Sequence, residues 1–245
     1  MKFIDWEEVI VINLNELTVE RFAKVFDMAI LAPNTQEAAI REGCRQAREY
    51  HLAAFYTTPC WTKVVAEELA GSDVLVGVGI GFPYGTPTTA IKMAEIDDAI
   101  ANGATTIDLM INVGALKDGN LDITRAEISG LAQKAKAKGY LCKVILEVGF
   151  LTDEEIATAT KICCEYGIDY VKTATGSQAL PDAHHVEVIK ANLSGNTKIK
   201  VSGVPRTFVL AACLRMLEMG VELIGTRSAC KIVDMYKAYL EEKKA

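Results

Sequence analysis

The feature that most constrains the fold is an eightfold alternation between two kinds of segment. Short runs of apolar and β-branched residues, typical of buried strands, alternate with longer segments of helical periodicity. The expected strands are Phe26–Leu31, Leu52–Thr57, Val74–Phe82, Thr106–Asn112, Leu141–Val148, Asp169–Ala174, Lys198–Ser202 and Glu222–Gly225. The expected helices are Gln36–Tyr50, Thr62–Leu69, Thr88–Asn102, Thr124–Lys138, Asp153–Tyr166, Ala183–Asn192, Phe208–Met219 and Ala229–Glu241. This alternation predicts parallel strands joined by right-handed crossovers.

An open doubly wound sheet and a closed barrel both fit this alternation. Eight units within about 220 residues favour a single (β/α)8 TIM barrel, an α/β fold with parallel strands. No linker or change of composition divides the 245 residues into two parts. We therefore expect one domain over residues 1–245, in which residues 1–25 form an N-terminal helical extension before the first barrel strand.

Several expected helices have sequence signals at their ends. Thr152 and Glu155 have the spacing of a capping box, in which each side chain accepts a hydrogen bond from the other residue's backbone N–H. Five glycines stand where a helix is expected to stop, as glycines at helix C-termini do: Gly71, Gly103, Gly139, Gly167 and Gly220.

The charge and the termini disfavour two classes of partner. The formal net charge is −6 with a pI near 5.2, and the lysines and arginines form no basic stripe, so we expect no nucleic-acid partner. The N-terminus carries acidic residues early and has no long apolar stretch, unlike a secretory signal. No window reaches the roughly 18 to 20 apolar residues of a membrane span, so we expect no membrane partner.

Cysteine and histidine spacing gives no sign of a metal site. The seven cysteines form no C-x-x-C pair and no zinc-ligand pattern, which favours free thiols in a cytoplasmic protein. The adjacent His184 and His185 point in different directions on a helix, so surface positions are the simpler interpretation. We expect neither a metal nor an organic cofactor.

Charged residues interrupt four consecutive expected strands, from the fourth to the seventh. Strands of a parallel barrel are covered on both faces and should be almost wholly apolar. Asp108, Lys143, Lys172 and Lys200 each break this rule. Burying an unpaired charge is costly, so such residues persist only with partners or a function. The alternative for any one lysine is an outward side chain that reaches solvent between the helices.

This grouping of lysines with a carboxylate favours one kind of chemistry. An amine in a dry site beside other cations has a lowered pKa, because burial and like charge both disfavour the ammonium. A neutral lysine attacks a carbonyl to form a Schiff base, which then withdraws electrons from a carbon–carbon bond. A second lysine and a carboxylate nearby would move the protons.

The chain resembles the 2-deoxyribose-5-phosphate aldolases over most of its length, from about Asp27 to Val233. The motifs that carry the resemblance are Gly81-Phe82-Pro83-Tyr84-Gly85 with Thr88-Thr89, Ile107-Asp108-Leu109-Met110-Ile111-Asn112-Val113-Gly114-Ala115-Leu116, Lys143-Val144-Ile145-Leu146-Glu147 with Leu151-Thr152-Asp153-Glu154-Glu155, and Val171-Lys172-Thr173-Ala174-Thr175-Gly176. The resemblance implies a class I aldolase, a carbon–carbon lyase that reversibly cleaves 2-deoxy-D-ribose 5-phosphate to acetaldehyde and D-glyceraldehyde 3-phosphate. It is also compatible with a homo-oligomer.

The resemblance assigns roles to the same four charged residues. Lys172 matches the family's Schiff-base lysine, and Asp108 and Lys200 match its proton-transfer pair. Lys143 matches a further lysine close to the site, and we expect it to help keep Lys172 neutral. The expected substrate- and phosphate-binding residues are Thr175, Gly176, Gly203, Arg206, Arg227 and Ser228.

The chain departs from the family pattern at substrate-facing strand ends. The departures are Met28-Ala29 for His-Thr, Tyr56 for Cys, Val148 for Thr, Val204-Pro205 for Gly and Ile or Val, and Arg227-Ser228-Ala229 for Ser-Ser-Gly. Arg227 adds a guanidinium that could bind phosphate or carboxylate. We hypothesise that the Schiff-base chemistry is kept while the acceptor end is reshaped; the alternative is sequence drift within one function.

Two other functions compete with the aldolase interpretation. The first keeps the imine but uses another phosphorylated or acidic sugar or aldehyde. The second is a barrel that has lost catalysis and binds a protein or metabolite. The intact Lys172, Lys200 and Asp108 argue against a catalytically lapsed barrel, and the changes at Met28, Tyr56 and Val204 argue for it.

Overall fold

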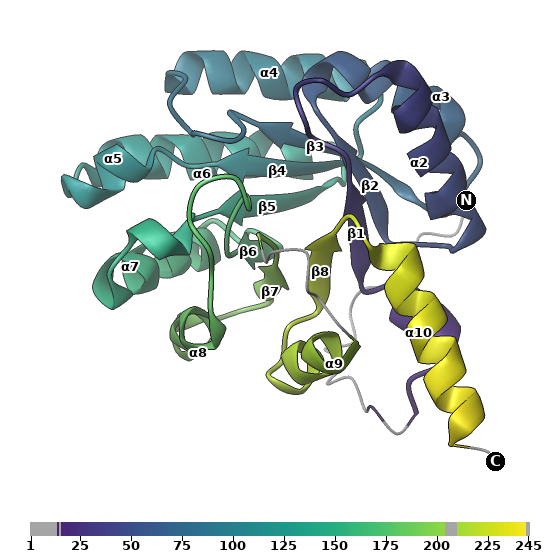
Figure 1. Cartoon of the computed structure of the whole chain (residues 1–245). Helices are drawn as coiled ribbons and strands as arrows, with labels where there is room; N and C mark the ends of the chain where they lie inside the picture. Colours follow the sequence, from purple (N-terminus) through teal and green to yellow (C-terminus); the bar gives the residue numbers. More distant parts are fainter. Residues whose placement is uncertain (1–13, 15, 204–209, 244–245) are drawn as a thin grey trace.

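Eight parallel strands close into a barrel in the computed structural model, which describes residues 14, 16–203 and 210–243 (Figure 1). The strands follow one another around the barrel in sequence order, and the first pairs with the last. They are β1 Phe26–Ala29, β2 Ala54–Thr57, β3 Leu75–Ile80, β4 Thr106–Met110, β5 Leu141–Ile145, β6 Tyr170–Lys172, β7 Lys198–Val201 and β8 Leu223–Thr226. The prediction of a closed TIM barrel rather than an open sheet is confirmed.

The helices lie outside the ring of strands (Figure 1). They are α1 Val19–Ala23, α2 Glu37–Glu49, α3 Thr62–Glu68, α4 Thr89–Ala101, α5 Val113–Lys117, α6 Leu121–Lys136, α7 Asp153–Glu165, α8 Ala183–Asn192, α9 Leu210–Glu218 and α10 Ala229–Glu242. Two short 3-10 turns, Pro59–Trp61 and Val148–Phe150, follow β2 and β5. Most bounds agree with the sequence-based expectation within a few residues.

Two differences from the expected helices have local causes. The short α5 was not expected; the side chain of Asn112 starts it by accepting a hydrogen bond from the Ala115 N–H at 3.0 Å. Helix α6 begins at Leu121, three residues before the expected Thr124, directly after the turn that ends α5. The expected start of α9 at Phe208 lies outside the described residues.

The expected helix-end signals are present. Thr152 and Glu155 form the capping box at the start of α7, where each side chain accepts the other's backbone N–H. All five glycines that we expected at helix ends have positive φ angles, for example 69° at Gly139 after α6. Side chains with a Cβ rarely adopt this left-handed conformation, so these positions end their helices.

The barrel interior is filled by a few large polar side chains opposite glycines. Residues that alternate along each strand point inward, and Tyr56 of β2 lies level with Gly77 of β3. A Cβ at Gly77 would lie 2.6 Å from the Tyr56 ring, so the ring needs glycine at this position. The apolar core proper lies between the outer faces of the strands and the helices, where residues such as Ile107 and Val144 are fully buried.

The described part of the N-terminal extension packs against the last helix. The Phe22 ring of α1 lies 4.3 Å from the Tyr236 ring of α10, centroid to centroid. The Tyr236 hydroxyl donates a hydrogen bond to the Leu17 carbonyl oxygen at 2.7 Å. These contacts join the segment before β1 to the end of the chain. None of the helices in the described ranges has both the length and the apolar character that a membrane crossing requires.

Candidate active site

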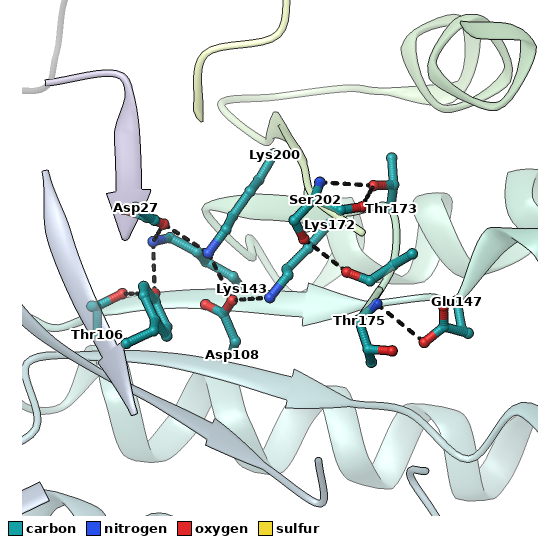
Figure 2. A network of polar contacts seen from close by, with 12 residues as sticks. Asp27, Thr106, Asp108, Lys143, Glu147, Lys172, Thr173, Thr175, Lys200 and Ser202 are labelled. Carbon is teal, nitrogen blue, oxygen red and sulfur yellow. Dashed lines mark hydrogen bonds and ion pairs between the residues drawn. The ribbon is translucent and has the colours of Figure 1, made fainter. Parts of the chain in front are cut away.

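The four charged residues singled out in the sequence meet inside the barrel (Figure 2). Lys172 Nζ donates to Asp108 Oδ2 at 2.7 Å, and Lys200 Nζ lies 2.8 Å from the same oxygen. Lys143 Nζ lies in the same cluster, near the face of the Tyr170 ring. All four side chains are buried, and Lys172 is the most exposed of them at 7%. The outward placement considered for these lysines is therefore excluded.

Strand register explains this convergence. Asp108 is level with Lys143 across the β4–β5 pair, and Lys172 is level with Lys200 across the β6–β7 pair. Side chains that are level on neighbouring strands point to the same side of a sheet. One inward-facing position on each strand therefore places all four groups in the barrel interior.

Asp27 of β1 completes the cluster and was not among the expected site residues. Its Oδ2 lies 2.9 Å from Lys143 Nζ and 2.7 Å from Lys200 Nζ. The carboxylate is 1% exposed. A charge within the short buried strand Phe26–Ala29 is the same signal that identified Asp108, so this criterion applied to the first strand would have found it.

Tyr56 also belongs to the site, although the sequence indicated it only as a departure from the family pattern. Its hydroxyl accepts a hydrogen bond from Lys143 Nζ at 2.8 Å and lies 2.9 Å from Thr106 Oγ1. The Lys200 ammonium lies 4.0 Å from the ring centroid, a cation–π distance. Tyr56 thus holds Lys143 through its hydroxyl and Lys200 through its ring face.

Ion pairs keep the two carboxylates charged in this dry environment. Burial by itself would raise the pKa of Asp108, but Lys172 and Lys200 outweigh it and hold that pKa below its ordinary value. Burial likewise opposes the charge of Asp27, and Lys143 and Lys200 lower its pKa. The cluster therefore contains two carboxylates and enough ammonium groups to neutralise them.

The lysines of the cluster differ in their affinity for a proton. Burial lowers the pKa of Lys172 from 10.5 to about 8, and the neighbouring Lys200 adds to the shift. Burial also opposes the charge of Lys200, but Asp108 and Asp27 together raise its pKa. The nearby cation that favours a neutral Lys172 is therefore Lys200, which contacts the same carboxylate, whereas Lys143 is held by Asp27 and Tyr56.

This difference predicts the pH dependence of imine formation at Lys172. Only the neutral amine attacks a carbonyl, so the rate of imine formation should rise with pH and level off above about 8. Reductive trapping of acetaldehyde with cyanoborohydride at several pH values, with the adduct on Lys172 quantified by mass spectrometry, measures this rate. A midpoint near the ordinary lysine value of 10.5 would contradict the assignment.

The cluster opens into a pocket of about 440 Å³. Asp27, Tyr56, Lys172 and Lys200 line its inner end. The loops after β6, β7 and β8 line most of the rest, together with residues that end or follow β1 and β3, as expected for a barrel whose ligands bind at the carboxyl ends of the strands.

Five of the six expected substrate-binding residues line this pocket: Thr175, Gly176, Gly203, Arg227 and Ser228. Gly176 and Gly203 have φ angles of 81° and 89°, and a Cβ on Gly176 would lie 2.8 Å from Gly203 Cα, so the loops after β6 and β7 touch. Arg227 is exposed at the rim, and Ser228 immediately precedes the N-terminus of α10. The sixth, Arg206, lies outside the described residues.

Other buried ionic groups lie away from the pocket. Lys92 of α4 and Glu127 of α6 form a fully buried pair at 2.7 Å and bind the backbone of Met110 and Asn112 at the end of β4. Within residues 14, 16–203 and 210–243, no three His, Cys, Asp or Glu side chains are grouped as metal ligands would be. His184 and His185 lie at the start of α8, where His184 pairs with Asp153 and His185 pairs with Asp182.

Comparison with known proteins agrees with this geometry. A sequence model described as DeoC/LacD family aldolase matches residues 22–219. A deoxyribose-phosphate aldolase of Bacteroides thetaiotaomicron is 39% identical over 230 residues, which cover 92% of this chain and 96% of the relative.

Two solved structures have the same barrel. A putative deoxyribose-phosphate aldolase from Coccidioides immitis superposes with a TM-score of 0.84 at 29% identity, covering 90% of this chain and 87% of the other. A deoxyribose phosphate aldolase from Aeropyrum pernix, described as a tetramer, gives 0.82 at 26% identity, covering 92% and 95%. With a buried lysine–aspartate cluster inside a closed barrel and these relatives over most of its length, the chain belongs to the DeoC/LacD family of aldolases.

Proposed function

We propose that this protein is a class I aldolase that reversibly cleaves 2-deoxy-D-ribose 5-phosphate to acetaldehyde and D-glyceraldehyde 3-phosphate. The observation that carries the proposal is Lys172, a buried amine of lowered pKa that lines the pocket and contacts Asp108 at 2.7 Å. The names of the relatives supply the substrate. An unbroken set of Lys172, Asp108 and Lys200 is not expected in a barrel that has lost catalysis.

The proposed reaction assigns a bond change to each group. The Lys172 amine adds to the aldehyde carbon C1 of the open-chain sugar, and loss of water gives a protonated imine. A base removes the proton of the C3 hydroxyl, the C2–C3 bond breaks, and its electron pair moves into the iminium to give an enamine. Glyceraldehyde 3-phosphate leaves, C2 of the enamine takes a proton, and water releases acetaldehyde and the free lysine.

Asp108 and Lys200 are the proposed carriers of these protons. Asp108 Oδ2 contacts both lysines, and both lysines line the pocket, so protons can pass between the substrate and Asp108 through them. Lys200 bridges Asp108 and Asp27 and holds a proton to return. A pair of this kind typically contributes 10²- to 10⁴-fold to a rate.

The outer end of the pocket has features that favour an anion. The exposed guanidinium of Arg227 and the N-terminus of the 14-residue helix α10 both lie at this end. A helix N-terminus and a guanidinium both attract phosphate. This supports a phosphorylated acceptor aldehyde rather than an uncharged one.

The experiment that tests the proposal is borohydride trapping with acetaldehyde, followed by peptide mass spectrometry. We expect a reduced two-carbon adduct on Lys172 and cleavage of 2-deoxy-D-ribose 5-phosphate in a coupled assay. An adduct without cleavage of this sugar would favour imine chemistry on another substrate. The absence of any adduct, while a relative treated in parallel is labelled, would favour a barrel without catalysis.

The role of Arg227 leads to a further prediction. Arg227→Ala should raise KM for the phosphorylated substrate by about tenfold or more, because a hydrogen bond to a charged group is lost. KM for the sugar without phosphate should change little. Steady-state kinetics on both sugars measures the difference, and Arg215→Ala, which alters an exposed arginine paired with Glu218 on α9, is the matched control. Equal effects on both sugars would contradict the assignment.

We further propose that the whole chain is one barrel domain whose first 25 residues precede the barrel, and that it forms a homo-oligomer in the cytoplasm. The packing of α1 on α10 supports the first point. The tetramer of the Aeropyrum pernix relative supports the second. All seven cysteines lie in the described ranges and carry free thiols, as is usual in a reducing compartment.

A further inference from the structure

Glu147 has an unusual conformation for which the reaction above gives no reason. It lies two residues after the end of β5 and has a φ angle of 57°, in the left-handed region that is unfavourable for a residue with a Cβ. Its side chain is 1% exposed. Burial raises the pKa of the Glu147 carboxyl. A strained backbone and a buried acid at the same residue persist only where surrounding contacts hold them.

The contact that explains this conformation is made with the loop after β6. Glu147 Oε2 accepts a hydrogen bond from the Thr175 backbone N–H at 3.1 Å (Figure 2). The next residue, Val148, donates its N–H to the Thr173 carbonyl oxygen at 3.0 Å. The left-handed turn at Glu147 thus points its carboxylate at the loop while the backbone remains paired with β6.

This loop forms part of the pocket wall. Thr175, Gly176, Ser177 and Leu180 all line the pocket. Gly176 touches Gly203 of the loop after β7, and Ser177 donates its N–H to Thr175 Oγ1 at 3.0 Å. The hydrogen bond to the Thr175 amide therefore anchors a segment that also contacts the loop after β7.

A second contact supports the loop from the same side. A Cβ on Gly149 would lie 2.6 Å from Ala179 Cβ and 3.0 Å from the Leu180 carbonyl oxygen. The turn Val148–Phe150 after β5 therefore presses directly on Ala179 and Leu180. Glu147 and Gly149 thus both contact the loop and together fix its position in the pocket wall.

We propose that Glu147 is a positioning residue that holds the loop Thr175–Leu180 where it receives the phosphorylated end of the substrate. The inference rests on the proposed aldolase function and adds a residue that does not touch the reacting atoms. Lys172 is held independently by strand pairing with Lys200 and by Asp108. Loss of Glu147 should therefore weaken substrate binding and spare imine formation.

The test compares Glu147→Ala with Glu147→Gln. Glu147→Ala should raise KM for 2-deoxy-D-ribose 5-phosphate at least tenfold and leave the rate of acetaldehyde trapping on Lys172 within twofold of the wild-type rate. Glu147→Gln keeps an oxygen that accepts the Thr175 N–H, so its KM should stay within threefold of the wild-type value. An unchanged KM in Glu147→Ala, or a trapping rate that falls as much as KM rises, would overturn the proposal.

Hydrogen–deuterium exchange gives a readout that does not depend on activity. The peptide that contains residues 173–180 should exchange at least tenfold faster in Glu147→Ala, but not in Glu147→Gln, because only the alanine leaves the Thr175 amide without its acceptor. If the wild-type protein traps no acetaldehyde, the proposed function fails, and the exchange experiment still decides whether Glu147 holds the loop. Unchanged exchange in Glu147→Ala would overturn the positioning role.

Two further variants separate positioning from general damage. Gly149→Ala should displace the loop through its new Cβ and raise KM in the same direction without slowing the trapping reaction. Asp169→Ala is the matched control, because the Asp169 carboxylate also accepts a backbone N–H, that of Cys142 at 2.8 Å, but stands before β6, at the opposite end of that strand from the loop. A rise in KM in Asp169→Ala equal to that in Glu147→Ala would contradict the proposal.

Discussion

A Lys172→Met variant is expected to lose aldolase activity by at least about 10⁴-fold, because it lacks the group that forms the imine. Methionine has nearly the same length and removes one ammonium from the cluster, where Lys200 and Lys143 still neutralise Asp108 and Asp27. The barrel should therefore stay folded. Steady-state cleavage of 2-deoxy-D-ribose 5-phosphate, with circular dichroism as the check on folding, measures the effect.

The choice of Lys172 over Lys200 as the nucleophile follows from charge and access. Lys200 is 1% exposed and contacts two carboxylates, whereas Lys172 is 7% exposed and contacts one. A pKa lowered from 10.5 to about 8 gives Lys172 on the order of 300-fold more neutral amine at pH 7 than an ordinary lysine. If Lys172→Met still trapped acetaldehyde, with the adduct on Lys200, the assignment would be wrong.

The sequence predicts the fold because each unit carries its own signals. The strands are apolar, the helices are periodic, and Thr152 or Gly139 marks an end through local backbone chemistry. Few topologies can accommodate eight such units in one domain, and the structure adopts one of them, the closed barrel. Local signals are less informative for α5, which has only five residues and is capped by Asn112.

The charged cluster was predictable only in part, because a sequence shows which strands contain charges but not which atoms meet. Asp108, Lys143, Lys172 and Lys200 violate the apolar pattern and were identified by that violation alone. Asp27 violates it equally, but it lies on the first strand, apart along the chain from the four consecutive strands on which the other charges fall. Register places Lys143 level with Asp108, yet the contacts to Asp108 Oδ2 come from Lys172 and Lys200, and no sequence pattern shows that pairing.

Loop residues were the least predictable from the sequence. The contact between Gly176 and Gly203 depends on two positive φ angles in loops 27 residues apart along the chain. The support that Glu147 gives to Thr175 depends on a left-handed turn that no local signal announces. The roles of Thr175, Arg227 and Ser228 in binding stay predictions, as does that of Arg206, which lies outside the described residues.

An Asp108→Asn variant is expected to separate imine formation from proton transfer. The asparagine keeps the shape of Asp108 but cannot take a proton, so kcat should fall about 10²- to 10⁴-fold. The amine of Lys172 remains and loses an ion pair that favours its charged form, so acetaldehyde should still be trapped on it. Exchange of the acetaldehyde methyl protons for deuterium, followed by NMR, isolates the proton-transfer step and should slow by a similar factor.

The control for this variant is a second buried carboxylate of similar environment. Glu127→Gln removes the partner of the buried Lys92, outside the pocket. Breaking a buried ion pair typically costs about 3–5 kcal/mol of stability, so Glu127→Gln reports how far destabilisation by itself affects the rate. Methyl exchange should continue in Glu127→Gln and slow in Asp108→Asn. If trapping and methyl exchange fell together in Asp108→Asn, the carboxylate would act by positioning Lys172, and the proton carrier would have to be sought at Lys200 and Asp27.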